Sequence, residues 1–349
     1  MATFTTPLGS FESTIADAIL GPEVATDHDR PPLGSFVFGP TFDGTCFIIK
    51  DNLLYYCKPK QPEYWPALYY IEVGPPQFPL QTGLVHNGQV YVFSKVAIWR
   101  VAGTGDGRFL PYRLDSKTGA QSIKGAVSIA GEGIYHTGQD GIYLFSGQTD
   151  RKLTEATLEP IFRGDAVNGM PAISDISTSW IHRFGNYLYF GYQSTGTNYP
   201  SNVLKLNLDS GSVEWYVFND GSDVEIRTVA TDDQNKRLLA GDNSGYVRVI
   251  DNPSYTDDSG TDISWAVQSK DFTLPTRAHF PRWVKYDIDA SGATSVTGEL
   301  ILDGTSHQSH TVTGDRTTKR RLVATGNGQR AAVKISGSGT ATIYTAEFE

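Results

Sequence analysis

The sequence predicts an all-β protein: a β-propeller of about five blades, or six if an N-terminal strand adds one, followed by a C-terminal β-sandwich. A strand–turn–strand phrase recurs along the first part of the chain at intervals typical of propeller blades. Gly (36), Tyr (18) and Phe (17) are abundant, as in proteins built from short strands and tight turns. Beyond residue 262 a different pattern of short strands begins.

Residues 1–32 are expected to form an N-terminal arm. Ser10–Ile19 has the pattern of one or two helical turns, with Ser10 as the cap. Thr26–Pro32 is predicted to be extended, because the two prolines at its end disfavour a helix.

Residues 33–262 carry the repeated phrase and are predicted to form the propeller. Each copy is a short apolar strand, a turn with Gly or Asp, and a strand rich in aromatic and β-branched residues. The copies read FIIKDNLLYY (47–56), NGQVYVFSKVAIWRV (87–101), GEGIYHTGQDGIYLF (131–145), GNYLYFGYQS with NVLKLNL (185–208) and NKRLLAGDNSGYVRVI (235–250). In four copies the second strand begins near Ala97, Gly141, Val203 and Tyr246, at spacings of 44, 62 and 43 residues.

Two insertions explain the spacing of 62 residues. Leu153–Phe162 has apolar residues at helical spacing, and the polar loop Gln193–Asn202 separates the two strands of the next copy. Because insertions between strands leave the core of a repeat intact, the interval lengthens without ending the series.

Residues 263–349 are predicted to form the β-sandwich. The polar, turn-rich stretch Asn252–Asp262 makes a plausible boundary before it. Seven short strands in about 80 residues fit a compact sandwich. They are Lys270–Leu274, Trp283–Asp289, Thr297–Leu302, His310–Thr313, Arg321–Ala324, Ala332–Ile335 and Thr342–Phe348.

The composition restricts the classes of function. The formal net charge of −9 argues against a DNA-binding protein that reads sequence, because such proteins place Lys and Arg on phosphates. It does not exclude a channel through which DNA slides. The first residues lack the charged and apolar regions of a secretory signal, and no apolar run approaches the roughly 18–20 residues of a membrane helix. We therefore expect a soluble protein made in the cytosol, without a membrane span.

Cys46 and Cys57 are predicted to be half-buried thiols. If Asp51-Asn52 is a two-residue hairpin turn, the two cysteines face each other at a hydrogen-bonded pair of the two strands. That geometry places the Cβ atoms less favourably for a disulfide than the closer alternative does, and we expect no disulfide.

No sequence motif indicates a cofactor, a metal or a nucleophile. The seven His residues form no HExxH motif, and His307 and His310 are expected on opposite sides of a strand. There is no GxSxG elbow and no Walker sequence. The sequence therefore predicts no catalytic, cofactor-binding or metal-binding residues, and no enzymatic activity.

Glycoside hydrolysis and carbohydrate binding form the alternative function. Five-bladed propellers can host glycoside hydrolysis, which needs two placed carboxyl groups. Four carboxylates near strand ends could approach a propeller axis: Asp140, Asp175, Glu225 and Asp242. Stacking on sugars would use Trp65, Tyr69, Tyr70, Tyr192, Tyr199 and Trp215, although aromatics on strands usually pack between blades. The basic run Lys319–Arg321 is interpreted as a guard on an edge strand or as an inter-subunit contact.

Several stretches resemble the tail hub and nozzle proteins of short-tailed, podovirus-like bacteriophages. Arg30–Pro66 is similar to their first propeller section, including a loop of the Pro-Glu-x-Trp type at Gln61–Pro66. Leu84–Val101 resembles their second blade. Gly138–Gly147, followed by RKLT at 151–154 and a short helix, resembles the third. Ile335–Tyr344 resembles their closing β-rich segment. The likeness covers residues 26–165 well and the remainder loosely.

This resemblance implies a structural virion protein of the phage tail, made in the host cytoplasm. Its copies would form a ring, expected to be a homohexamer, below the portal and adaptor. The ring would extend the DNA channel, retain packaged double-stranded DNA until ejection, and anchor tail fibre or tailspike proteins. Six copies at −9 each would carry a formal charge of about −54, and an acidic lumen repels the phosphate backbone.

Overall fold

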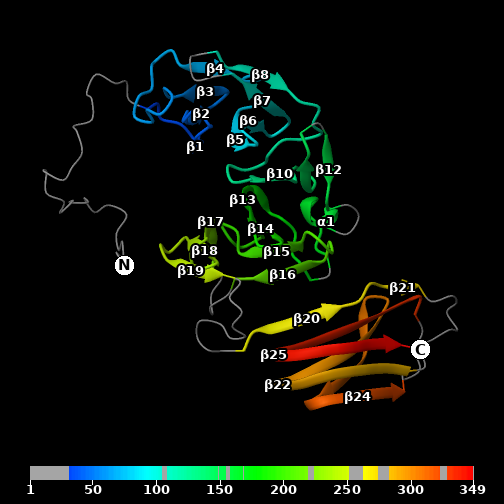
Figure 1. Cartoon of the computed structure of the whole chain (residues 1–349). Helices are drawn as coiled ribbons and strands as arrows, with labels where there is room; N and C mark the ends of the chain where they lie inside the picture. Colours follow the sequence, from blue (N-terminus) through cyan, green and yellow to red (C-terminus); the bar gives the residue numbers. More distant parts are fainter. Residues whose placement is uncertain are drawn as a thin grey trace, which may run out of the picture. The chain divides into compact units, whose positions relative to one another are not determined.

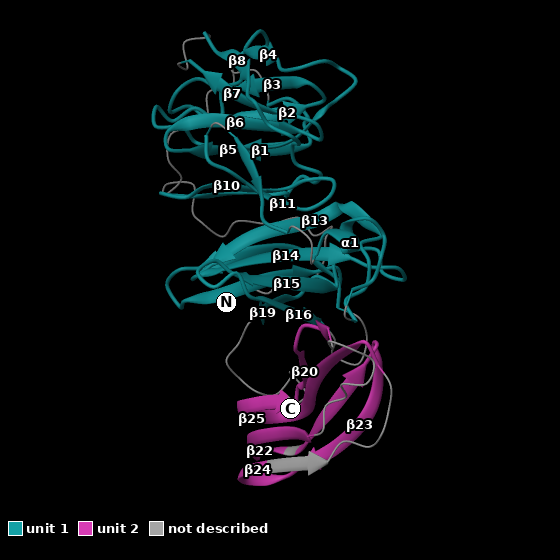
Figure 2. Cartoon of the chain, turned by 90° about the vertical axis from the view of Figure 1, so that its right-hand side faces the viewer, with its two compact units in different colours: residues 1–251 teal, residues 252–349 magenta. Residues whose placement is uncertain are grey.

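The computed structural model confirms an almost entirely β-stranded chain. It describes residues 31–103, 108–147, 149–154, 158–167, 169–218, 224–250, 262–273, 283–322 and 328–348. The chain divides into two compact units, residues 1–251 and 252–349 (Figure 2). The predicted boundary after residue 262 falls inside the second unit. The arm predicted for residues 1–32 lies outside the described residues, apart from its last two.

Within its described residues, the first unit contains five small antiparallel sheets, each built from consecutive strands. The first sheet holds β1 (Phe36–Phe38), β2 (Phe47–Lys50), β3 (Leu53–Tyr56) and β4 (Tyr70–Glu72). The second holds β5 (Leu80–His86), β6 (Gln89–Ser94), β7 (Ile98–Ala102) and β8 (Leu110–Arg113). The third holds β9 (Ala126–Ile129), β10 (Gly133–Thr137), β11 (Ile142–Phe145) and β12 (Asp150–Lys152). The fourth holds β13 (Asp175–Phe184), β14 (Tyr187–Gln193), β15 (Asn202–Asn207) and β16 (Val213–Val217). The fifth holds three strands: β17 (Ile226–Asp232), β18 (Arg237–Asp242) and β19 (Val247–Ile250).

The five sheets are arranged as propeller blades. The first strand of each sheet contacts the first strand of the next, in the order β1, β5, β9, β13 and β17. In Figure 1 the sheets follow one another along an arc, with β1–β4 at one end and β17–β19 at the other. Five blades are therefore described, the lower number that the sequence predicted.

Each recognised phrase corresponds to the second and third strands of a sheet, which are the two middle strands in the four-stranded sheets. The first phrase pairs β2 with β3 through a two-residue turn, since Lys50 lies opposite Leu53. Asp51 in this turn has a φ of 55°, a left-handed conformation that Asp tolerates better than most residues. The hairpin register predicted for this pair is confirmed.

Apolar side chains fill the spaces between successive sheets. Bulky aromatic and aliphatic residues from facing sheets interdigitate there and keep the blades in contact. The main groups are Phe47, Leu54, Val92, Trp99 and Phe109 between the first and second sheets; Tyr91, Phe93, Ile134 and Phe145 between the second and third; Ile142, Ile181, Leu188 and Phe190 between the third and fourth; and Trp180, Tyr189, Val203, Leu238 and Ala240 between the fourth and fifth.

The predicted insertion contains a helix of one turn, shorter than expected. Helix α1 spans Glu159–Phe162, with Pro160 in its first turn and Ile161 buried in the core. Residues 155–157 of the predicted helix lie outside the described residues. Thr154, just before them, is buried and accepts a hydrogen bond from the Ile142 backbone N–H at 3.1 Å, so this part of the segment belongs to the edge of the third sheet.

The second unit is one strongly bent sheet that closes over its own core. Its strands are β20 (Ser264–Gln268), β21 (Phe272–Thr273), β22 (Trp283–Leu302), β23 (Thr305–Val312), β24 (Gly314–Leu322) and β25 (Arg330–Phe348). The first half of β22 pairs with β24, and its second half pairs with β23, while β25 follows both halves. The two layers enclose a core that includes Tyr286, Ile288, Val296, Leu300 and Val333.

Two pairs of predicted strands are single strands in the structure. Trp283–Asp289 and Thr297–Leu302 are both parts of β22, and Ala332–Ile335 and Thr342–Phe348 are both parts of β25. The register between β22 and β25 shifts around Gly292. This irregularity bends the strands, so Ser291-Gly292 looks like a turn in the sequence although the pairing continues through it.

The two cysteines are free thiols in the described structure. The Cys57 backbone N–H donates to the Cys46 carbonyl at 3.1 Å, which confirms the predicted hydrogen-bonded register. Burial raises the pKa of Cys57 to about 11, against a smaller opposing effect of its backbone hydrogen bond with Cys46. This thiol is therefore protonated and unreactive at neutral pH.

Among the described residues, no helix has the length and apolar character needed to cross a membrane.

Candidate functional site

The inner strands of all five sheets surround a cavity of about 220 Å³ at the axis of the first unit. Its walls are mainly apolar, and Thr82, Lys124, His182 and Thr228 add polar groups. The complete lining is Phe36, Thr82, Gly83, Ile123, Lys124, Ala126, Val127, Trp180, Ile181, His182, Thr228 and Val229. Propeller axes are concave sites in which several blades can contribute groups to one ligand.

Lys124, which lines this cavity, contacts the backbone of Arg227. The Lys124 Nζ donates a hydrogen bond to the Arg227 carbonyl at 2.7 Å, and the Arg227 guanidinium lies 4.3 Å from the centre of the Tyr199 ring. Burial, and to a smaller degree the charge of Arg227, lower the pKa of the Lys124 amine. No sequence motif predicted this contact, since Lys124 and Arg227 are 103 residues apart.

Hydrogen bonds from histidine rings to hydroxyl groups tie neighbouring inner strands together. His86 of β5 contacts the Ser128 hydroxyl of β9 through Nδ1 at 2.8 Å. His182 of β13 contacts the Thr231 hydroxyl of β17 through Nε2 at 2.8 Å. Burial lowers the pKa of both imidazoles, so both rings are neutral at physiological pH. The two histidines therefore act as uncharged links around the axis.

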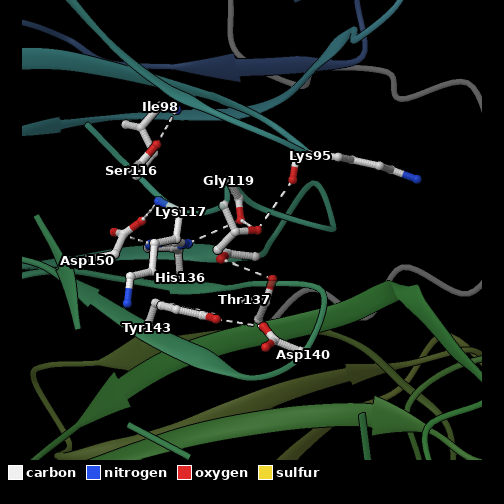
Figure 3. Close-up of polar contacts among 12 residues, drawn as sticks. Lys95, Ile98, Ser116, Lys117, Gly119, His136, Thr137, Asp140, Tyr143 and Asp150 are labelled. Atoms are coloured by element: carbon white, nitrogen blue, oxygen red, sulfur yellow. Dashed lines mark hydrogen bonds and ion pairs between the residues drawn. The ribbon is translucent and has the colours of Figure 1, made fainter. Parts of the chain in front are cut away.

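His136 and Asp150 form a fully buried pair inside the third sheet (Figure 3). The His136 Nε2 lies 3.0 Å from Asp150 Oδ1, and its Nδ1 lies 3.2 Å from the Gly119 carbonyl. Both ring nitrogens of His136 therefore face oxygen atoms. The second carboxylate oxygen of Asp150 accepts the Lys117 backbone N–H at 2.9 Å. Both ring nitrogens of His136 and both carboxylate oxygens of Asp150 therefore have polar partners within the protein.

The segment that reaches this pair also binds the second sheet. Gln121 Nε2 donates to the Lys95 carbonyl at 2.8 Å. The Ile98 N–H donates to Ser116 Oγ at 3.1 Å (Figure 3). The His136–Asp150 pair therefore lies in a network that joins the second and third blades. No substrate could reach it without opening the interface between these blades.

Asp140 is one of the four carboxylates singled out from the sequence, and it lies in the turn between β10 and β11. It accepts hydrogen bonds from the Tyr143 hydroxyl at 2.6 Å and from Lys152 Nζ at 2.7 Å (Figure 3). Burial alone would raise the pKa of Asp140, but the bonds from Lys152 and Tyr143 outweigh it and lower the pKa. Lys152 also pairs with Glu159 at 3.1 Å, which fastens the helical insertion to the sheet.

The other three carboxylates are also bonded to their surroundings. Asp175 accepts the Ser177 N–H at 2.8 Å in a local turn. Glu225 accepts the Asn198 N–H at 2.7 Å and Asn243 Nδ2 at 2.8 Å. Asp242 accepts the Tyr246 N–H and Arg248 Nε, both at 2.8 Å. None of the four lines the axial cavity, and no cluster of three metal-ligating side chains occurs among the described residues.

The six candidate aromatic residues do not gather on one surface. Trp65 and Tyr192 are buried, and their polar atoms donate to the carbonyls of Pro62 and Pro171. Trp215 Nε1 donates to Asn202 Oδ1 at 3.2 Å. Within the first sheet Tyr69 packs on Tyr56 and Tyr70 on Tyr55, with ring centres 5.0 and 5.4 Å apart. The Tyr199 ring lies under the Arg227 guanidinium.

The remaining candidates lie in the second unit. His307 and His310 are on β23, and the His310 ring contacts Tyr286, with ring centres 6.4 Å apart. Lys319–Arg321 is on β24, which pairs with β22 along one side and is an edge strand within the described part of the unit. The predicted edge position of this basic run is confirmed. Its inter-subunit role stays a prediction.

Comparisons with known proteins give partial structural likenesses. No protein-family model matches the chain, and no curated protein matches its sequence. The extracellular domain of a one-component system, BT4673 from B. thetaiotaomicron, aligns with 64% of this chain and 26% of its own length, at 13% identity and a TM-score of 0.40. PorZ, a surface component of the type-IX secretion system of Porphyromonas gingivalis, aligns with 94% of this chain and 46% of its own, at 13% identity and a TM-score of 0.37.

Hsv2 of Kluyveromyces marxianus aligns with 61% of this chain and 62% of its own length, at 7% identity and a TM-score of 0.35. This chain therefore spans less than two thirds of each of these structures. At such identities and TM-scores, none of them carries an argument about function.

Proposed function

We propose that this protein is a structural component of a short-tailed bacteriophage tail, of the nozzle or hub type, and that it acts through assembly. An assembly role is supported by the surroundings of the four carboxylates that were candidates for catalysis. Asp140, Asp175, Glu225 and Asp242 each bond a nearby turn, loop or cation, and none of them reaches the axial cavity. The resemblance of residues 30–66, 84–101 and 138–154 to tail hub and nozzle proteins supports the tail.

In this proposal the copies form a ring, taken to be a hexamer, that continues the channel below the portal and adaptor. Packed sheets give rigid and broad surfaces, which ring contacts and attached fibre or tailspike proteins need. A chain with a net charge of −9 gives the ring an acidic character, so double-stranded DNA passes without adhering. The protein then resides in the virion tail.

The test is the mass and shape of the purified full chain. Light scattering after size exclusion, with negative-stain electron microscopy, is expected to show rings of about 230 kDa for six copies of the 38.2 kDa chain. Mass spectrometry of virions from a phage that encodes the chain is expected to detect it in stoichiometric amount. A monomer at high concentration that is also absent from virions contradicts the proposal. Glycan hydrolysis, or specific binding on a glycan array, would favour the carbohydrate alternative.

A further inference from the structure

Two inner strands of the first unit contain a bulge at the point where each reaches the axial cavity. In β5 one extra residue lies between Leu80 and Thr82, relative to the pairing with β6. In β17 one extra residue lies between Ile226 and Thr228, relative to the pairing with β18. A bulge changes the direction in which nearby side chains point. Thr82 and Thr228, each the first paired residue after a bulge, both line the cavity.

The inner strand of the fourth sheet has a similar arrangement. Its pairing with β14 is interrupted between Asp175 and Trp180, and Trp180 is the first paired residue after the interruption. Trp180, Ile181 and His182 then line the cavity in succession. Three strands of separate sheets thus depart from regular pairing directly before they contribute to one space. Bulges are common beside active sites, where they redirect side chains, and this coincidence favours a ligand site at the cavity.

The cavity has a buried floor and an exposed mouth. On the floor, Thr82 is 2% exposed and Trp180 is 1% exposed. At the mouth, Ile123 is 40% exposed, and Lys124 and Thr228 are exposed as well. A small molecule can therefore enter from solvent and bury one end against the apolar walls.

The volume of the cavity restricts the size of its ligand. A space of about 220 Å³ equals the liquid volume of about seven water molecules, each of which takes up ~30 Å³. Drug-sized ligands occupy larger pockets, of about 300–1,000 Å³. The ligand is therefore a compound of roughly ten non-hydrogen atoms or fewer.

Lys124 supplies a cation that has no acidic partner within the described part of the chain. Its Nζ donates one hydrogen bond, to the Arg227 carbonyl, and takes part in no salt bridge there. Because an ammonium group has three donors, two of them are available to a ligand. Ammonium groups form stronger hydrogen bonds with a carboxylate than with a neutral acceptor.

The Thr82 hydroxyl is a second available group, on the floor of the cavity. It makes no hydrogen bond to any of the residues that the structure describes, although its side chain is buried. Buried hydroxyls usually have a polar partner. A polar atom at the inner end of a ligand would provide one.

We propose that the axial cavity binds a small carboxylate that has an apolar body and a polar atom at its far end. The carboxylate lies at the mouth, where Lys124 and the Thr228 hydroxyl donate hydrogen bonds to it. The body lies against apolar walls that include Phe36 and Val127, and the polar atom meets the Thr82 hydroxyl. One ammonium matches the single charge of a carboxylate, whereas phosphate groups are commonly held by several cations or backbone N–H groups.

Calorimetric titration of the purified full chain with 4-hydroxybenzoate at pH 7 tests the proposal. One molecule is expected to bind per chain. 4-Hydroxybenzamide has the same shape without the charge, and is expected to bind at least tenfold more weakly. Lys124→Met is expected to weaken binding of the carboxylate at least tenfold and to leave binding of the amide unchanged. Lys95→Met removes an exposed lysine outside the cavity, and is expected to change neither affinity.

The contact on the floor is tested with benzoate, which lacks the hydroxyl. Benzoate is expected to bind the wild type about fivefold more weakly than 4-hydroxybenzoate, and Thr82→Val is expected to remove this preference. Thermal melting followed by circular dichroism shows whether each variant is folded.

The proposal is overturned if the wild type binds the carboxylate and the amide equally, or binds neither. It is also overturned if Lys95→Met weakens binding as much as Lys124→Met, because the carboxylate would then respond only to surface charge. All residues that line the cavity belong to one chain, so binding does not require a ring. Failure of the ring proposal and failure of this one are therefore separate results.

Discussion

Individual buried polar residues join the blades of the first unit. Asp150 is one of them, and both of its carboxylate oxygens make buried polar contacts. Its carboxylate serves His136 with one oxygen and the Lys117 N–H with the other, without solvent access. Removing one member of such a pair leaves the other polar group buried and without its partner. We expect Asp150→Ala to lower the free energy of unfolding of the first unit by about 3–5 kcal/mol, measured by urea denaturation.

Asp150→Asn is the matched variant for this prediction. It keeps an oxygen for the Lys117 N–H but loses the charge that faces His136, so a smaller loss of stability is expected. Asp209→Ala removes an exposed carboxylate that accepts the Asn186 side chain, and a change within about 0.5 kcal/mol is expected. Equal effects of Asp150→Ala and Asp209→Ala would contradict the role given to the buried pair.

The histidines between inner strands predict a dependence of stability on pH. Burial lowers the pKa of His86 and His182 below the ordinary 6.5, so the unfolded chain binds protons more readily than the folded chain. Their contribution is complete above pH ~6.5 and is lost as the pH falls from there through the lower pKa of the folded state. The urea midpoint of the first unit is expected to decrease between pH 7.5 and 5.

His182→Gln isolates one of these two groups. The Gln amide can contact the Thr231 hydroxyl without titrating, so the variant is expected to resemble the wild type at pH 7.5 and to lose less stability on acidification. Parallel pH curves for the variant and the wild type would show that His182 does not supply the effect.

At the scale of elements, the sequence predicted the second and third strands of each sheet in the first unit and not the others. β6 and β7 are mostly buried on both faces, so they appear as apolar runs around a tight turn. β9 has one fully buried residue in four, and β8 has none. Such strands are held by pairing and by neighbouring sheets, which leave no periodic signal in a single sequence.

The contact between the fourth and fifth sheets depends on one glycine. Gly191 of β14 lies opposite Trp180 of β13, and an added Cβ would collide with the indole. Trp180 Nε1 donates to the Ile226 carbonyl of β17 at 3.2 Å, so the indole connects the two sheets. We expect Gly191→Ala to destabilise the first unit by about 1–3 kcal/mol and to raise hydrogen exchange in β17.

Gly328→Ala serves as the control for this substitution. An added Cβ there meets its neighbours at ordinary contact distances, and a change within about 0.5 kcal/mol is expected. Trp180→Phe keeps an aromatic ring but loses the hydrogen bond to Ile226, for an expected cost of about 1 kcal/mol plus lost packing. If Gly191→Ala left β17 protected, the indole would not be the link between the sheets.

At the scale of the molecule, a physical reason separates the features that the sequence predicts from those that it does not. The period of the repeat predicted the propeller, because each copy contains its own strands and turn. The axial cavity is lined by residues from all five sheets that lie far apart in the sequence, so no local pattern predicts it. The contacts of two candidate carboxylates, in contrast, are local. Asp175 and Asp242 accept hydrogen bonds from backbone N–H groups two and four residues further along the chain, as Asp commonly does in turns.

The separate cores of the two units predict that each responds to its own mutations. Phe190 is fully buried in a core of the first unit, and Leu300 is buried in the core of the second. Phe190→Ala is expected to cost about 3–5 kcal/mol and Leu300→Ala about 2–5 kcal/mol, each in its own unit. Hydrogen exchange in increasing urea follows both units in one sample, since peptides report their position. Two transitions are expected, and each variant should shift one of them. If either variant lowers the protection of both units together, they unfold as a single cooperative body and the division near residue 251 has no thermodynamic meaning.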